Sequence, residues 1–165
     1  MSLSELAGRR IFVTGSTGFV GTALVERLLR CVPDVELVLL VRDSRRSSAA
    51  RRVEREVLRN DCFDRLRAEL GEDGFARRCK QVSVVSGDVG TDGLGLDPDG
   101  RAALKSCDVV IHSAATVAFD SPLDKAVEVN LLGPVRIAEL LGELGSRPHL
   151  VCVSTCYVAG NRRGS

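Results

Sequence analysis

The chain has 165 residues, 44% of them hydrophobic, and is therefore long enough to bury the core of one domain. Its 23 basic and 22 acidic residues give a net charge of +1, which excludes the strong single-sign field of proteins that bind nucleic acid or anionic lipid non-specifically. No aromatic residue interleaves with the arginines of Arg42–Arg59, which also argues against base stacking. We expect one domain spanning 1–165, with no nucleic-acid partner.

The sequence does not predict secretion or insertion into a membrane. Its start, MSLSELAGRR, lacks the long apolar stretch of a signal peptide. The longest apolar run, Leu37–Val41, is far shorter than the roughly 20 residues that cross a bilayer. The six cysteines form no Cys-x-x-Cys pair and have no histidine at metal-ligand spacing. We expect a cytoplasmic protein with reduced thiols, no metal and no integral membrane segment.

Short apolar runs alternate with segments of helical spacing along the whole chain. The runs, which we predict to be strands, are Ile11–Thr14, Val35–Val41, Val82–Val85, Val109–His112 and Leu150–Ser154. Helices are predicted at Gly18–Cys31, within Ser47–Leu70, at Pro98–Lys105 and at Pro122–Leu144. In the last of these, the side chains expected to face inward are Ala126, Val127, Leu131, Val135, Ala138 and Leu141.

Near-continuous apolar strands joined by helices indicate a parallel sheet that is covered on both faces. We therefore predict an α/β fold of the Rossmann type, a doubly wound parallel sheet with strand order 3-2-1-4-5. Such sheets commonly have six or more strands, whereas only five are predicted here. We expect the domain to be incomplete, truncated after the fifth strand.

A glycine-rich turn follows the first predicted strand. The sequence Thr14-Gly-Ser-Thr-Gly-Phe-Val-Gly21 has the Gly-x-x-Gly-x-x-Gly spacing between a strand and a helix. Gly15 permits a tight turn, Gly18 permits close approach of a pyrophosphate, and Gly21 permits close packing of the helix. Because the N–H groups of a helix start attract phosphate, this turn predicts a dinucleotide site.

Arg42 and Asp43 follow the second predicted strand, where this fold holds the adenosine ribose. An acidic residue there accepts the 2′-hydroxyl of NAD, whereas an arginine pairs with the 2′-phosphate of NADP. Arg42 therefore favours NADP(H), and Asp43 leaves the alternative open. Arg51 and Arg52 are candidates for a second phosphate contact, the alternative being a solvated helix face.

The third and fourth strand ends open onto the same crevice in this fold. Asp88 is a candidate for bonding the adenine amino group, although it could simply cap a turn, and small Ala114 and Ala115 would let a cofactor lie close. His112 is expected to pack rather than to catalyse.

Hydroxyl groups follow the fifth predicted strand, next to the expected nicotinamide position. Ser154 and Thr155 are adjacent, so alternation places only one of them in the crevice, where it would donate a hydrogen bond to a substrate carbonyl. Tyr157 lacks a lysine four residues on, where Asn161 stands, and is interpreted as structural or substrate-facing.

In this order, the motifs resemble those of the extended short-chain dehydrogenases/reductases. Within that superfamily the chain is similar to the fatty acyl-CoA reductases and thioester reductase domains, the male-sterility-like NAD-binding family. The segments that carry the likeness are Thr14–Gly21, Leu40–Arg42, Gly87–Val89, Leu94–Leu96, Val110–Phe119, Val129–Gly133 and Val153–Val158.

The resemblance implies NADPH-dependent reduction of a fatty acyl-CoA or other acyl thioester to an aldehyde and, after a second hydride, an alcohol. It implies a supporting role for Asn130 as a buried helix residue, and Thr155 matches the catalytic Ser/Thr. Implied cofactor contacts are Gly15, Ser16, Thr17, Gly18, Phe19, Val20 and Gly21 to the phosphates, Arg42 with Arg51 or Arg52 to the 2′-phosphate, Asp88 and Val89 to adenine, and Ala114, Ala115 and Thr116 to the ribose and nicotinamide.

The family's Tyr-x-x-x-Lys pair is absent from this sequence. The chain is therefore expected to be the amino-terminal part of a longer reductase, able to bind NADP(H) but inactive alone. Two alternatives stay open. One is another extended short-chain enzyme, of the sugar-nucleotide epimerase, dehydratase or hydroxysteroid dehydrogenase type. The other is a non-catalytic NADP-sensing module.

Overall fold

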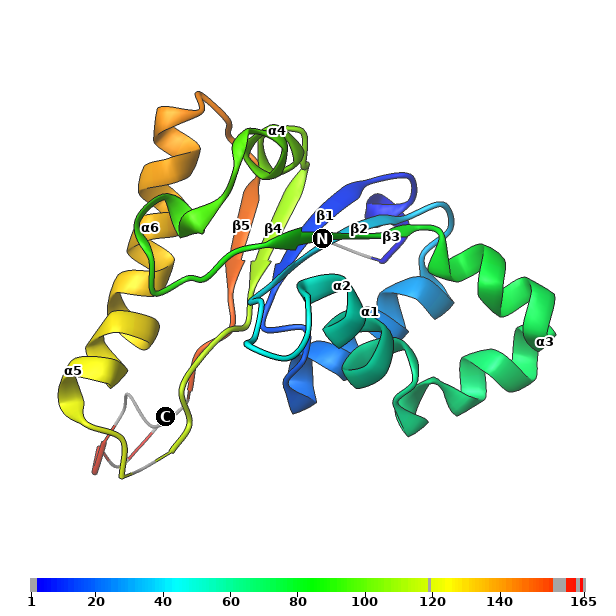
Figure 1. Cartoon of the computed structure of the whole chain (residues 1–165), viewed down its shortest axis with the longest axis horizontal. Coiled ribbons are helices and arrows are strands. Elements are labelled where there is room, and N and C mark those ends of the chain that lie inside the picture. Colours follow the sequence, from blue (N-terminus) through cyan, green and yellow to red (C-terminus); the bar gives the residue numbers. More distant parts are fainter. Residues whose placement is uncertain (1–2, 119, 156–159, 163, 165) are drawn as a thin grey trace.

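A parallel sheet of five strands forms the centre of the computed structural model, which describes residues 3–118, 120–155, 160–162 and 164 (Figure 1). The strand order is β3-β2-β1-β4-β5, which confirms the predicted topology. The strands are β1 (Arg10–Thr14), β2 (Glu36–Val41), β3 (Val82–Ser86), β4 (Val109–His112) and β5 (His149–Cys152). The prediction for the fifth strand was wrong at its end, because β5 stops at Cys152 and Ser154 lies beyond it.

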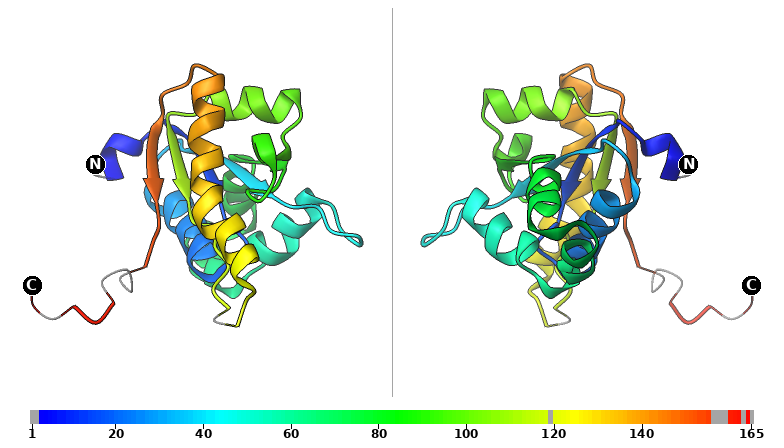
Figure 2. Two further views of the ribbon diagram at one scale, coloured as in Figure 1. Left: turned by 90° about the vertical axis from the view of Figure 1, so that its left-hand side faces the viewer. Right: turned by 90° about the vertical axis from the view of Figure 1, so that its right-hand side faces the viewer.

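Helices cover both faces of the sheet (Figures 1 and 2). The α-helices are α1 (Phe19–Cys31), α2 (Ala49–Arg52), α3 (Asp64–Cys79), α4 (Pro98–Lys105), α5 (Leu123–Ala126) and α6 (Leu132–Glu143). Two π-helical segments, Val53–Leu58 and Val127–Leu131, continue α2 and α5. Three 3₁₀ turns lie at Leu3–Leu6, Asp61–Phe63 and Asp92–Gly95.

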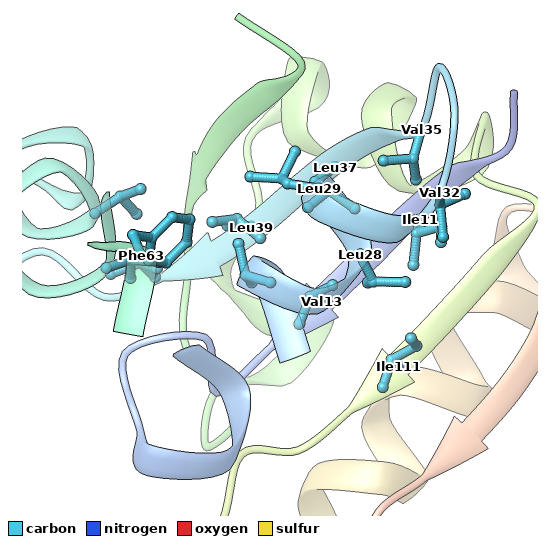
Figure 3. Close-up of a cluster of buried hydrophobic side chains, with 14 of the residues drawn as sticks. Ile11, Val13, Leu28, Leu29, Val32, Val35, Leu37, Leu39, Phe63 and Ile111 are labelled. Carbon is cyan, nitrogen blue, oxygen red and sulfur yellow. The ribbon is translucent and has the colours of Figure 1, made fainter. Parts of the chain in front are cut away.

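Two apolar cores lie on opposite faces of the sheet, and β1 contributes to both. Ile11 and Val13 point toward α1, whereas Phe12 between them points toward α4 and α6, and all three are fully buried. Figure 3 shows the first core, in which Leu28 and Leu29 of α1 meet the strands. Because β1 is buried on both faces, its three central residues are all apolar, which is why alternation is missing from its sequence.

The second predicted helix proved to be several elements, so the expectation of one helix within Ser47–Leu70 was wrong. Helix α3 also continues past that range to Cys79. The π-helical segment ends at Leu58, and Asn60 caps the next turn by accepting a hydrogen bond from the N–H of Cys62. Within α3, Gly71 has φ +66°, which produces a kink. Side-chain capping at Asn60 thus divides a stretch whose apolar spacing is nearly continuous, and the kink at Gly71 follows just beyond it.

The inward face predicted for the last helix was also wrong in part. Leu131 and Val135 are 59% and 44% exposed, and Ala138 is exposed, whereas Ile137, Leu140 and Leu141 are buried. The reason is the π-helical segment Val127–Leu131, which has more residues per turn than an α-helix. The buried face of α6 is therefore out of phase with the face extrapolated from the residues before it.

Candidate functional site

A cleft of about 630 Å³ opens at the carboxyl ends of β1, β2, β3 and β4. This is the edge at which doubly wound sheets bind ligands. Ten of the predicted site residues line it, namely Gly15, Thr17, Gly18, Arg42, Arg52, Asp88, Val89, Ala114, Ala115 and Thr116. The chain thus brings most of the predicted positions together, from segments far apart in sequence.

The glycine-rich turn joins β1 to α1 at the floor of this cleft. Gly15 has φ +75°, and a Cβ atom there would lie 2.5 Å from the N atom of Ala114. A Cβ atom on Gly21 would overlap the carbonyl oxygen of Gly15. Gly18 is the N-cap of α1 and supplies no side-chain cap hydrogen bond to the first N–H groups of the helix. Those N–H groups and the helix dipole favour a phosphate group at this end.

Ser16 lies inside the turn and is fully buried. Its Oγ atom has no hydrogen-bond partner among the described residues. A buried hydroxyl without a partner costs about 1–3 kcal/mol, so it fits a site in which a ligand supplies an acceptor. The turn, the uncapped start of α1 and this hydroxyl together fit the phosphates of a dinucleotide.

Thr14 connects the glycine-rich turn to the end of β4. Its Oγ1 atom accepts hydrogen bonds from the N–H groups of Ser113 and Ala114, each at 3.3 Å. The same atom lies 2.8 Å from Nδ1 of His112, a side chain only 4% exposed. Burial lowers the pKa of His112, so its ring is neutral at neutral pH. The predicted packing role of His112 agrees with these contacts.

Two arginine side chains lie at the β2 side of the cleft, each beside an acidic side chain. Nη1 of Arg42 lies 3.6 Å from Oδ2 of Asp88, and both side chains are partly exposed. Arg52 donates a hydrogen bond from Nη1 to the carbonyl oxygen of Arg42, at 2.8 Å, and pairs with Glu56. Two guanidinium groups therefore lie beside the end of β2, where a phosphate could pair with them.

Asp43, the next residue along the chain, points its carboxylate into a different set of contacts. Oδ2 accepts a hydrogen bond from Oγ of Ser86 at 2.5 Å, and Oδ1 accepts one from the N–H of Ala49 at 2.6 Å. These bonds, that from Ser86 first, lower the pKa of Asp43. Arg42 lines the cleft, and Asp43 lies outside its lining.

The segment after β4 is held by the π-helical segment Val127–Leu131. Asn130 accepts a hydrogen bond from the N–H of Thr116 at 2.8 Å and donates one to its carbonyl oxygen at 2.9 Å. Asn130 is exposed, so the expectation of a buried residue was wrong, although its side chain does support the cleft. Nine residues that line the cleft were not among the predicted site residues, namely Thr14, Leu40, Val41, Gly87, Ser113, Asp124, Lys125, Glu128 and Val129. The first five flank predicted residues at the strand ends. The other four lie one to six residues before Asn130, and only that closeness in sequence could have indicated them.

The remaining predicted site residues lie elsewhere. Phe19 and Val20 are 95% and 54% exposed at the start of α1, so any phosphate contact there would come from their backbone. Arg51 is exposed on α2, and Thr155 is exposed beyond β5. The predicted roles of these four stay predictions, and Tyr157 lies outside the described residues.

The described part of the chain contains no group of three or more His, Cys, Asp or Glu side chains placed to hold a metal ion. Within the same residues, no helix is long and apolar enough to cross a membrane.

Comparison with known proteins agrees with this geometry. Residues 13–165 match the NAD-binding family described as "Male sterility protein". The chain is 36% identical over 155 residues to "Fatty acyl-CoA reductase wat" of Drosophila melanogaster, covering 93% of this chain and 29% of that protein. It is 32% identical over 164 residues to "Fatty acyl-CoA reductase 2, chloroplastic" of Arabidopsis thaliana, covering 98% of this chain and 27% of that protein.

A solved structure is similar as well. The terminal R domain from the myxalamid PKS-NRPS biosynthetic pathway has a TM-score of 0.73 and 28% sequence identity, covering 95% of this chain and 37% of that one. The chain thus spans about a third or less of the length of these proteins. Because the family match covers nearly all of it, the chain belongs to the NAD-binding male sterility family, a family of oxidoreductases that use a nicotinamide nucleotide.

Proposed function

We propose that the chain is the NADP(H)-binding part of a fatty acyl-CoA reductase. The relatives named as fatty acyl-CoA reductases support the substrate class, a fatty acyl-CoA or another acyl thioester. When bound, NADPH supplies the hydride that reduces such a thioester to an aldehyde and, with a second hydride, to an alcohol. The chain by itself is expected to bind cofactor without turnover, because its sequence has no Tyr-x-x-x-Lys pair.

One observation carries the choice of NADP(H) over NAD(H). At the end of β2 the cleft is lined by Arg42 and Arg52, whereas the carboxylate of Asp43 is occupied by Ser86 and Ala49. A 2′-phosphate carries about two negative charges and favours guanidinium partners, and the 2′-hydroxyl of NAD favours a carboxylate.

The other cofactor contacts follow the lining of the cleft. The turn of Gly15–Gly21 would hold the phosphates, Asp88 and Val89 the adenine, and Ala114–Thr116 the nicotinamide ribose. Thr155 would donate a hydrogen bond to the substrate carbonyl oxygen as the hydride arrives. The proposal includes a cytoplasmic location, which the five free thiols among the described residues support.

Isothermal titration of the chain with NADPH and with NADH tests the cofactor assignment. We expect tighter binding of NADPH, and we expect Arg42→Ala to weaken NADPH binding about tenfold or more while changing NADH binding little. Arg45→Ala is the matched control, since Arg45 is equally exposed in the same segment but does not line the cleft. Equal or tighter binding of NADH by the unaltered chain would contradict the proposal.

A further inference from the structure

The position of Asp43 raises a question about the preference of the site for NADP(H) over NAD(H). It is the first acidic residue after β2, and in dinucleotide-binding folds such an acid binds the ribose hydroxyls of NAD. A free carboxylate here would also repel a 2′-phosphate. A site built around Arg42 therefore needs this carboxylate to be kept away from the ribose.

The hydrogen bonds to Asp43 use both of its carboxylate oxygens. Ser86 lies at the end of β3, and the sheet register pairs it with Val41, two residues before Asp43. Its Oγ donates to one oxygen at 2.5 Å. The N–H of Ala49, the first residue of α2, donates to the other at 2.6 Å. Bonds to a charged acceptor are stronger than neutral ones, so the two together hold the side chain in one orientation.

The backbone around Asp43 is held as well. The carbonyl oxygen of Arg42 accepts the bond from Arg52, and Ser44 and Ser47 form an antiparallel bridge that closes the loop between β2 and α2. In Figure 2 this loop, drawn in cyan, projects from the body of the molecule, and residues 43–46 within it are exposed. These hydrogen bonds therefore orient it.

We propose that Asp43 is a specificity-determining residue, whose carboxylate is held out of the cleft by Ser86 and by the N–H of Ala49, so that the site favours a 2′-phosphorylated dinucleotide. This inference rests on the proposed cofactor site. Removal of either donor frees the carboxylate to rotate toward the ribose, where it accepts the 2′-hydroxyl of NADH and opposes the 2′-phosphate of NADPH.

The test is the ratio of the dissociation constants for NADH and NADPH, measured by isothermal titration. Ser86→Ala removes one donor without altering the cleft lining, and we expect the ratio to fall about fivefold or more. Ser83→Ala is the matched control. Ser83 lies on the same strand and loses a comparable hydrogen bond, donated to the carbonyl oxygen of Leu37 at 3.1 Å, but is remote from Asp43.

A second donor variant keeps the test independent of any folding defect in the first. Ala49→Pro removes the N–H at the first position of a helix, where proline is well tolerated, and should lower the ratio in the same direction. Thermal melting of each variant checks that it is folded at the titration temperature.

Asp43→Asn distinguishes a carboxylate that binds the ribose from one that is held away from it. Alone, it should leave NADH binding unchanged, because Asp43 does not touch the ribose, and combined with Ser86→Ala it should restore the high ratio. The inference is overturned, with NADPH preference intact, if neither donor variant changes the ratio of the NADH and NADPH dissociation constants. Weaker NADH binding in Asp43→Asn alone overturns it in the same way. An unaltered chain that binds neither dinucleotide overturns the proposed function and this inference together.

Discussion

The hydroxyl of Thr14 determines the state of a neighbouring histidine. Because Oγ1 already accepts two backbone N–H groups, its own proton is left to donate to Nδ1 of His112. This arrangement requires the neutral tautomer of His112 that carries its proton on Nε2. A second proton on Nδ1 would find no acceptor in the fully used Thr14 oxygen, which agrees with the lowered pKa of His112. His112 is held neutral as a structural partner.

Thr14→Val tests this arrangement at the level of one residue. Valine has the same shape, so the change removes only hydrogen bonds. It leaves the N–H of Ala114 and Nδ1 of His112 without this partner, whereas the N–H of Ser113 keeps its second acceptor, the carbonyl oxygen of Thr14. We expect a loss of about 2 kcal/mol in the free energy of unfolding, measured by denaturant titration. Thr14→Ser keeps the hydroxyl and should lose clearly less, so equal losses in the two variants would contradict the account.

At the scale of elements, what the sequence could predict depended on whether local geometry was regular. The five strands and α4 were predicted correctly because apolar runs and helical spacing are local signals, and the strand order followed from the topology that alternating strands and helices favour. The inward face of α6 was not, since nothing in the spacing of Leu131 and Val135 reveals a π-helical segment. The partners of Asp43 could not be predicted either, because Ser86 is 43 residues away and only the sheet brings it close.

That π-helical segment is expected to matter for cofactor binding through Asn130. Asn130→Ala should weaken NADPH binding several-fold, by about 1 kcal/mol, because it frees the Thr116 backbone in the cleft wall. Titration measures the affinity, and hydrogen exchange at the Thr116 amide, expected to quicken, measures the positioning. Leu131→Ala, at the adjacent exposed residue, is the control. Wild-type affinity in Asn130→Ala would show that Thr116 needs no such support.

At the scale of the whole molecule, the described residues leave part of the sheet near β5 exposed. In the sheet register Val151 of β5 pairs with Ile111 of β4. Ile111 belongs to the apolar core on the α1 side of the sheet. Val151 is 38% exposed and Val153, just past the strand, 47%. Exposed apolar side chains on a strand at the end of the strand order favour association between molecules.

Self-association of the chain should therefore increase with concentration, as measured by sedimentation velocity. Val153→Lys places a charge on this edge and should shift the distribution toward monomer. Ala23→Lys adds the same charge at an exposed position of α1 and should not. A chain that sediments as a monomer at every concentration would refute the expectation.

The close contact between Gly15 and the Ser113–Ala114 backbone also limits how the cleft can move. It lies between β1 and β4, the neighbours at which the strand order reverses, so both halves of the sheet meet there without room for a side chain. A hinge needs space for its backbone to turn, and this junction has none. Opening of the cleft therefore cannot come from a rotation at this junction, which fixes the distance between the two halves of the sheet at the cleft floor.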